Sequence, residues 1–133
     1  MDFDLNTEQR QLQSTTRQFA SSELAGLAEM LEKESVPVPL DWRKRYADLG
    51  LLGVNTAEEY GGLGLSLLDA ILIIEEAAKV SVAVAFPIFE CLTGPVRIVE
   101  KFGAPELKNR ILPAAVRGEA LVAISMSEPD AGT

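Results

Sequence analysis

The sequence contains no histidine and only one cysteine, Cys91. Without imidazole groups, neither histidine acid–base catalysis nor histidine-ligated metal sites can arise within these 133 residues. A single cysteine cannot form an internal disulfide bond and provides no metal-binding pattern. Cys91 stands in an apolar stretch without a basic neighbour in the sequence, so we predict a buried structural thiol rather than a nucleophile.

Basic residues are also scarce, with 12 Lys and Arg against 20 Asp and Glu and a formal net charge of −8. Nucleic acids and anionic membranes are polyanions, so this balance argues against both as the main partner. The acidic residues occur in scattered pairs, such as Glu58-Glu59 and Glu75-Glu76, rather than in a tail. This pattern predicts solvated helix faces, with a function based on charge as the alternative.

Long hydrophobic runs are absent as well. The apolar stretch at residues 67–74 is interrupted by Asp69 and stopped by Glu75, well short of the ~20 residues that a membrane helix needs. The amino terminus has neither the basic start nor the apolar run of a signal peptide. We therefore expect no membrane insertion and a cytoplasmic location. The hydrophobic content of 47% is ordinary for a globular domain with one core.

The remaining pattern is mostly helical. Asn6 and Gln9 form a capping-box pattern ahead of a long amphipathic helix that we expect to end before Ser35. Further helices are predicted over residues 40–49, 67–79 and 82–102, with a short helix that starts at 104–106 and another turn at 113–116. The segment 67–79 is apolar nearly all round and should be central. Pro87 and Pro95 should bend or divide the segment 82–102. The predicted fold class is all-α.

A Gly-Gly-Leu-Gly segment at residues 61–64 precedes one of these helices and could cradle a phosphate. However, no clear strand precedes it, no Lys-Ser/Thr follows it, and its spacing fits neither the P-loop nor the dinucleotide fingerprint. We predict a structural turn that needs positive φ angles.

No pair of carboxylates is placed for acid–base chemistry. Glu75 and Glu76 should point to different sides of their helix. Glu90 interrupts the apolar run 83–89 and is a candidate for lining a pocket, although a carboxylate on the helix surface is the commoner outcome. No catalytic residue and no metal ligand is predicted.

The pattern changes at Ala120, where a short run with strand character begins and a turn signal at residues 128–132 follows. A lone strand cannot satisfy its backbone groups, so we expect its partners beyond Thr133. Residues 127–133 also carry hydroxyls and free amides that could hold a heteroaromatic cofactor or an oxyanion, with a simple turn as the alternative.

Nine segments together, by their order and spacing, resemble the amino-terminal part of the acyl-CoA dehydrogenase family, the flavoenzymes that desaturate acyl-CoA thioesters. These segments are LNTEQ (5–9), LGLLG (49–53), EEYGGLG (58–64), EEAA (75–78), FG (102–103), ELK (106–108), ILP (111–113), GE (118–119) and SEPDAGT (127–133). The resemblance implies that residues 1–118 are the helical amino-terminal domain. Residues 119–133 would be the start of the middle β-domain, truncated at Thr133, which a carboxy-terminal helical bundle follows in the family.

The resemblance also implies FAD as the cofactor. It places the Ser127 hydroxyl near the flavin N5, where fixed dipoles orient the ring and tune its electron affinity. The other implied cofactor contacts are main-chain groups and the closing turn, at Ile124, Ser125, Met126, Gly132 and Thr133.

The helix that contains Phe86, Phe89, Glu90 and Thr93 resembles the one that lines the acyl-chain pocket of the family. Phe86 and Phe89 would then shape or restrict the acyl group, with ordinary core packing as the alternative. Ala57 departs from the family by replacing a frequent proline.

The activity implied is α,β-desaturation of an acyl-CoA, with an electron-transfer flavoprotein or similar acceptor as partner and a homo- or hetero-oligomeric state. The glutamate base of the family lies outside these residues, so this chain alone is expected to be inactive. The alternatives are a flavin oxidase or monooxygenase with the same fold, or a stand-alone helical interaction module.

Overall fold

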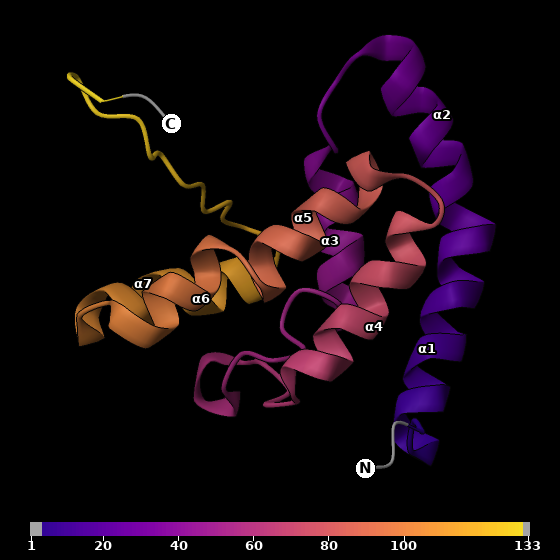
Figure 1. Ribbon diagram of the computed structural model, residues 1–133, viewed down its shortest axis with the longest axis horizontal. Coiled ribbons are helices and arrows are strands. Elements are labelled where there is room, and N and C mark those ends of the chain that lie inside the picture. Colours follow the sequence, from indigo (N-terminus) through magenta and orange to yellow (C-terminus); the bar gives the residue numbers. More distant parts are fainter. Residues whose placement is uncertain (1–3, 132–133) are drawn as a thin grey trace.

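The computed structural model describes residues 4–131, and within them every regular element is a helix (Figure 1). The all-α fold class is confirmed. In chain order the elements are α1 (Thr7–Phe19), η1 (Ala20–Leu24), α2 (Ala25–Glu34), α3 (Leu40–Asp48), η2 (Glu58–Tyr60), α4 (Leu67–Ala78), α5 (Val82–Leu92), α6 (Pro95–Phe102) and α7 (Pro105–Val116).

The first long helix forms as predicted, with one irregular turn. At its start the backbone N–H of Gln9 donates to Asn6 Oδ1 at 2.8 Å, and the Asn6 N–H donates to Gln9 Oε1 at 3.1 Å, which completes the capping box. The helix runs through α1 and α2, and between them η1 is a single wider π-helical turn. It ends at Ser35, which has a left-handed φ of 53°.

Helix α4 packs against α1 on one side and α5 on the other (Figure 1). Ser66 and Asp69 form the capping box at its start. Its inner residues Ala70, Ile73 and Ala77 are buried, but Leu67 is 60% exposed and Leu68 and Ile71 are also exposed. The prediction of a central helix is therefore right for one face and wrong for the other, because no described helix covers the outer face.

Tyr46 of α3 lies at the centre of the core and is fully buried. Its hydroxyl donates to the Val84 carbonyl of α5 at 3.1 Å, which satisfies the one polar atom of the side chain. The ring meets Phe19 edge to face with centroids 6.2 Å apart. Burial raises the pKa of the phenol. Tyr46 thereby joins α1, α3 and α5.

Pro95 divides the segment 82–102 as predicted, whereas Pro87 does not interrupt its helix. Pro87 lies inside α5, while Pro95 occupies the first turn of α6 after Gly94. By length and composition alone, Val82–Phe102 is apolar enough to cross a membrane, with a mean hydropathy of 1.6. This is weak evidence, because core helices pass the same test and 44% of the segment is buried within the fold.

No strand forms at residues 120–126, although the sequence predicts one. The segment extends away from the helices as an irregular tail (Figure 1). Within residues 4–131 it has no second strand to supply partners for its backbone groups, which explains the difference. The predicted turn is present, because Glu128 and Ala131 form an isolated bridge with N–H···O distances of 2.9 and 3.3 Å.

Candidate functional site

The outer face of α5 carries an exposed pair of aromatic side chains. Val84, Ile88 and Cys91 point into the core, whereas Phe86 and Phe89 are 51% and 43% exposed. The two phenyl rings contact each other with centroids 5.8 Å apart and planes tilted by 32°. Their exposure argues against ordinary core packing as their role.

A groove of about 250 Å³ lies between this aromatic pair and α4. We call it the apolar groove, and its lining residues are Ile74, Ala78, Val82, Ala85, Phe86 and Phe89. None of these side chains carries a polar atom. The groove can therefore hold a hydrocarbon chain but offers its ligand no side-chain hydrogen bond.

Thr93 lines a second depression, of about 440 Å³, on the same side of α4 and α5. We call this the Thr93 cavity, and its other lining residues are Asn55, Leu65, Leu67, Ile71, Leu92 and Arg97. Positions 86, 89 and 93 share one face of α5 by helical geometry. The Thr93 hydroxyl donates to the Phe89 carbonyl at 3.0 Å.

Glu90 does not line either of these two depressions. It is half-buried, and burial raises its pKa while the positive charge of Arg43 opposes that shift. Of the four residues that the resemblance implies for substrate binding, the structure therefore brings Phe86 and Phe89 to one groove and Thr93 to its neighbour. Glu90 lies beside Arg43 instead.

The residues predicted to hold the cofactor lie in the tail. Ile124, Ser125, Met126 and Ser127 are all exposed. Their main-chain groups and hydroxyls make no hydrogen bond to other described residues. Gly132 and Thr133 lie outside the described residues. The cofactor contacts remain predictions.

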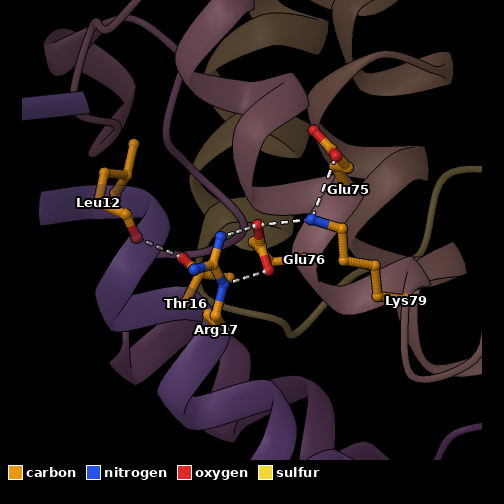
Figure 2. Close-up of polar contacts among 6 residues, drawn as sticks. All are labelled: Leu12, Thr16, Arg17, Glu75, Glu76 and Lys79. Carbon is orange, nitrogen blue, oxygen red and sulfur yellow. Dashed lines mark hydrogen bonds and ion pairs between the residues drawn. The ribbon is translucent and has the colours of Figure 1, made fainter. Parts of the chain in front are cut away.

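Glu76 is a buried carboxylate between α1 and α4 whose contacts the sequence does not predict (Figure 2). Arg17 donates to both oxygens of Glu76, with Nε–Oε2 and Nη2–Oε1 distances of 3.0 and 2.9 Å. Lys79 Nζ adds a bond to Oε1 at 2.8 Å. The bonds from Arg17, then those from Lys79, lower the pKa of Glu76 to about 2 against the opposing effect of burial.

The prediction of a solvated Glu75-Glu76 pair is wrong for Glu76. The Glu76 side chain is 1% exposed, whereas that of Glu75 is 53% exposed and forms an ion pair with Lys79 at 3.2 Å. Arg17 is 59 residues away in the sequence, so no local pattern indicates the contact. The sequence feature that could have indicated a buried ion pair was a charged residue within the largely apolar α4.

Cys91 is buried, as predicted. Burial, and secondarily the negative charge of Glu90, raise the pKa of the thiol to about 12. We expect native protein to react negligibly with iodoacetamide near neutral pH, because the thiolate is the reacting species. Mass spectrometry of the alkylated protein measures this, with urea-unfolded chain as the control. Rapid stoichiometric labelling of folded protein would show that the thiol is accessible.

Comparisons with known proteins agree with one another. Residues 6–119 match the family model described as acyl-CoA dehydrogenase, N-terminal domain. The acryloyl-CoA reductase (NADH) of Anaerotignum propionicum is 35% identical over 100% of this chain and 33% of its own length. The mitochondrial isovaleryl-CoA dehydrogenase of Bos taurus is 33% identical over 97% of this chain and 30% of its own.

A solved structure of acyl-CoA dehydrogenase complexed with FAD from Bacillus anthracis superimposes with a TM-score of 0.86. Its sequence identity is 30%, and the match covers 97% of this chain and 22% of that one. The chain thus spans about a third of the length of the curated relatives it matches.

Proposed function

The chain belongs to the acyl-CoA dehydrogenase family, and from this we propose that it is the amino-terminal portion of an FAD-dependent enzyme that desaturates an acyl-CoA between its α and β carbons. The observation that carries the proposal is the apolar groove. Phe86 and Phe89, to which the family resemblance gives a role in substrate binding, line it together, and its wholly apolar side chains suit a hydrocarbon tail.

The tail would supply one side of the cofactor site. Ser125 and Ser127 present hydroxyls, and residues 124–127 present main-chain groups with no hydrogen-bond partner among residues 4–131; these are the donors and acceptors that a flavin ring needs. When bound, FAD would accept the hydride that leaves the β carbon. The Ser127 hydroxyl would hold and orient the ring at N5, while the α proton would go to a glutamate outside these residues.

The helical domain would bind the acyl chain and exclude water from it. A hydrocarbon in the apolar groove would lie against the two phenylalanines and the α4 side chains Ile74 and Ala78. Burying it there is favoured by about 25 cal/mol for each Å² of apolar surface removed from water. This binding would fix the acyl chain while the chemistry takes place at its other end.

A second candidate is the reverse reaction, reduction of an enoyl-CoA at the expense of NADH. The identity of 35% to a relative that is an NADH-dependent acryloyl-CoA reductase favours it.

The test is anaerobic reduction of the flavin in the purified complete protein. We expect saturated acyl-CoA to bleach the flavin absorbance, with reoxidation by an electron-transfer flavoprotein or similar acceptor. Fast reoxidation by oxygen would identify an oxidase, and bleaching by NADH with turnover of enoyl-CoA would identify the reductase. Failure of every acyl chain length and of NADH to bleach the flavin would contradict both proposals.

We further propose an oligomeric state and a cytoplasmic location, the first from the family resemblance and the second from the sequence. The chain alone would be inactive, because the base and most of the cofactor site would be supplied by segments it does not contain.

A further inference from the structure

The loop at residues 53–57 is tied to α5 and α6 by three hydrogen bonds. Asn55 Nδ2 donates to the Leu92 carbonyl at 2.9 Å, and Arg97 Nη1 donates to the Asn55 carbonyl at 2.6 Å. The Ala57 N–H donates to Glu100 Oε1 at 3.0 Å. Arg97 and Glu100 also form an ion pair one turn apart on α6. We call these contacts the Asn55 clamp.

The clamp acts on the carboxyl end of α5. Leu92 is the last residue of that helix, so its carbonyl lacks a partner within the helix, and the buried Asn55 amide supplies one. At the same place the N–H groups of Thr93 and Gly94 both donate to the Phe89 carbonyl, at 2.9 and 3.2 Å, and turn the chain into α6. The bend after α5 is thus held by its own backbone and by the loop.

The same residues form one wall of the Thr93 cavity. Asn55, Leu92 and Arg97 face Leu67 and Ile71 of α4 across it. Asn55 Oδ1 is buried and accepts no hydrogen bond from any residue that the structure describes, and because Nδ2 already donates to the Leu92 carbonyl, a flip of the amide would not change this. Asn55 therefore contributes to the lining of the cavity and carries a buried acceptor that no described residue satisfies.

We propose that Glu100 is a positioning residue for substrate binding: through Arg97 and the Asn55 clamp it fixes the Thr93 end of the α5 face that receives the acyl group. Glu100 itself lines neither the apolar groove nor the Thr93 cavity. Its carboxylate binds the Ala57 N–H and pairs with Arg97. Arg97 in turn binds the Asn55 carbonyl, and the Asn55 amide binds the last carbonyl of α5. This inference rests on the proposed function.

The kinetic test compares Glu100→Ala and Glu100→Gln in the complete protein. Glu100→Ala removes both contacts, so we expect the KM for acyl-CoA to rise about tenfold while kcat stays within about twofold. Glu100→Gln keeps an oxygen for the Ala57 N–H and should recover part of the KM. A mere loss of stability would not produce this separation or this rescue.

Glu23→Ala is the matched control. It also removes a carboxylate that pairs with an arginine, since Glu23 binds Arg45 at 2.9 Å, but between η1 and α3, away from the Thr93 cavity. Its KM should equal that of the wild type. Equal KM values for Glu100→Ala and Glu23→Ala would overturn the proposal.

A second readout does not depend on catalysis. In the 133-residue chain, Glu100→Ala should speed hydrogen exchange at the amides of Thr93 and Gly94 at least about tenfold relative to Glu23→Ala. If exchange changes but wild-type protein is never reduced by acyl-CoA, the proposed function fails and the clamp stands. If wild-type protein is active but neither exchange nor KM changes, the clamp fails and the function stands.

Discussion

Glu76→Gln is expected to lower the free energy of unfolding by about 2–3 kcal/mol, because charged hydrogen bonds in a buried site contribute that much and the amide replaces only part of them. The Glu76 carboxylate accepts from Arg17 and from Lys79, and it holds α1 against α4 (Figure 2). Urea unfolding followed by circular dichroism measures the change.

Glu75→Gln is the matched control, since it makes the same substitution one residue earlier. Glu75 is half exposed and forms an ion pair with Lys79 at 3.2 Å, so the free energy of unfolding of Glu75→Gln should lie within about 0.5 kcal/mol of that of the wild type. If the two variants lost equal stability, the burial of Glu76 would not be the cause, and the interpretation of the cluster would be wrong.

The same cluster predicts a pH dependence with a definite sign. The pKa of Glu76 is lowered from its ordinary 4.5 to about 2 in the folded protein. Between these values the unfolded chain binds more protons, so stability rises with pH there. The contribution is fully present above 4.5 and disappears as the pH falls toward 2. The difference in unfolding free energy between wild type and Glu76→Gln should therefore shrink as the pH is lowered through that window. A difference that stays constant would contradict the lowered pKa of Glu76.

Gly62→Ala is expected to destabilise the chain by about 3 kcal/mol or more, the range of severe overpacking. A Cβ at this position would lie 2.0 Å from the Thr56 carbonyl oxygen and 2.7 Å from that of Gly53. Both obstacles are backbone atoms of the loop that carries Asn55, so neither can move without breaking the loop. The neighbouring bond from the Leu63 N–H to the Gly53 carbonyl, at 2.8 Å, would also be strained.

Gly26→Ala provides a control of opposite sign. Gly26 lies in α2, and an added Cβ there would meet no atom within 4 Å. The substitution should stabilise the chain by about 0.5–1 kcal/mol, because alanine loses less entropy than glycine in a helix. Thermal unfolding should therefore shift down for Gly62→Ala and up for Gly26→Ala. An unchanged or upward shift for Gly62→Ala would show that the loop tolerates a side chain.

The glycine-rich segment 61–64 was only partly predictable from the sequence, and Gly62 is the part that was not. The sequence predicts a structural turn rather than a phosphate loop, and Gly61 and Gly64 do adopt positive φ angles of 87° and 62°. The requirement at Gly62 is different, because it comes from packing against residues 53 and 56. No dipeptide pattern reports that kind of contact.

Residues close together in the sequence account for the parts of the fold that the sequence determined. The Asn6–Gln9 and Ser66–Asp69 capping boxes each act across three residues, and Pro95 acts on its own turn. These interactions need only local backbone geometry, so the starts of α1, α4 and α6 could be predicted correctly. The same holds for the all-α class, which follows from hydrophobic periodicity.

The tertiary structure alone decided which helix faces are covered. Glu75 and Glu76 are chemically identical, yet a rotation of about 100° along α4 puts one in solvent and the other against Arg17. In α5 the same rotation separates the buried Ile88 from the exposed Phe89. Burial depends on which helix packs alongside, and Arg17–Glu76 and Asn55–Leu92 join residues 59 and 37 positions apart. Contacts at such separations arise only when the chain has folded, so local pattern could not reveal the carboxylate cluster or the clamp.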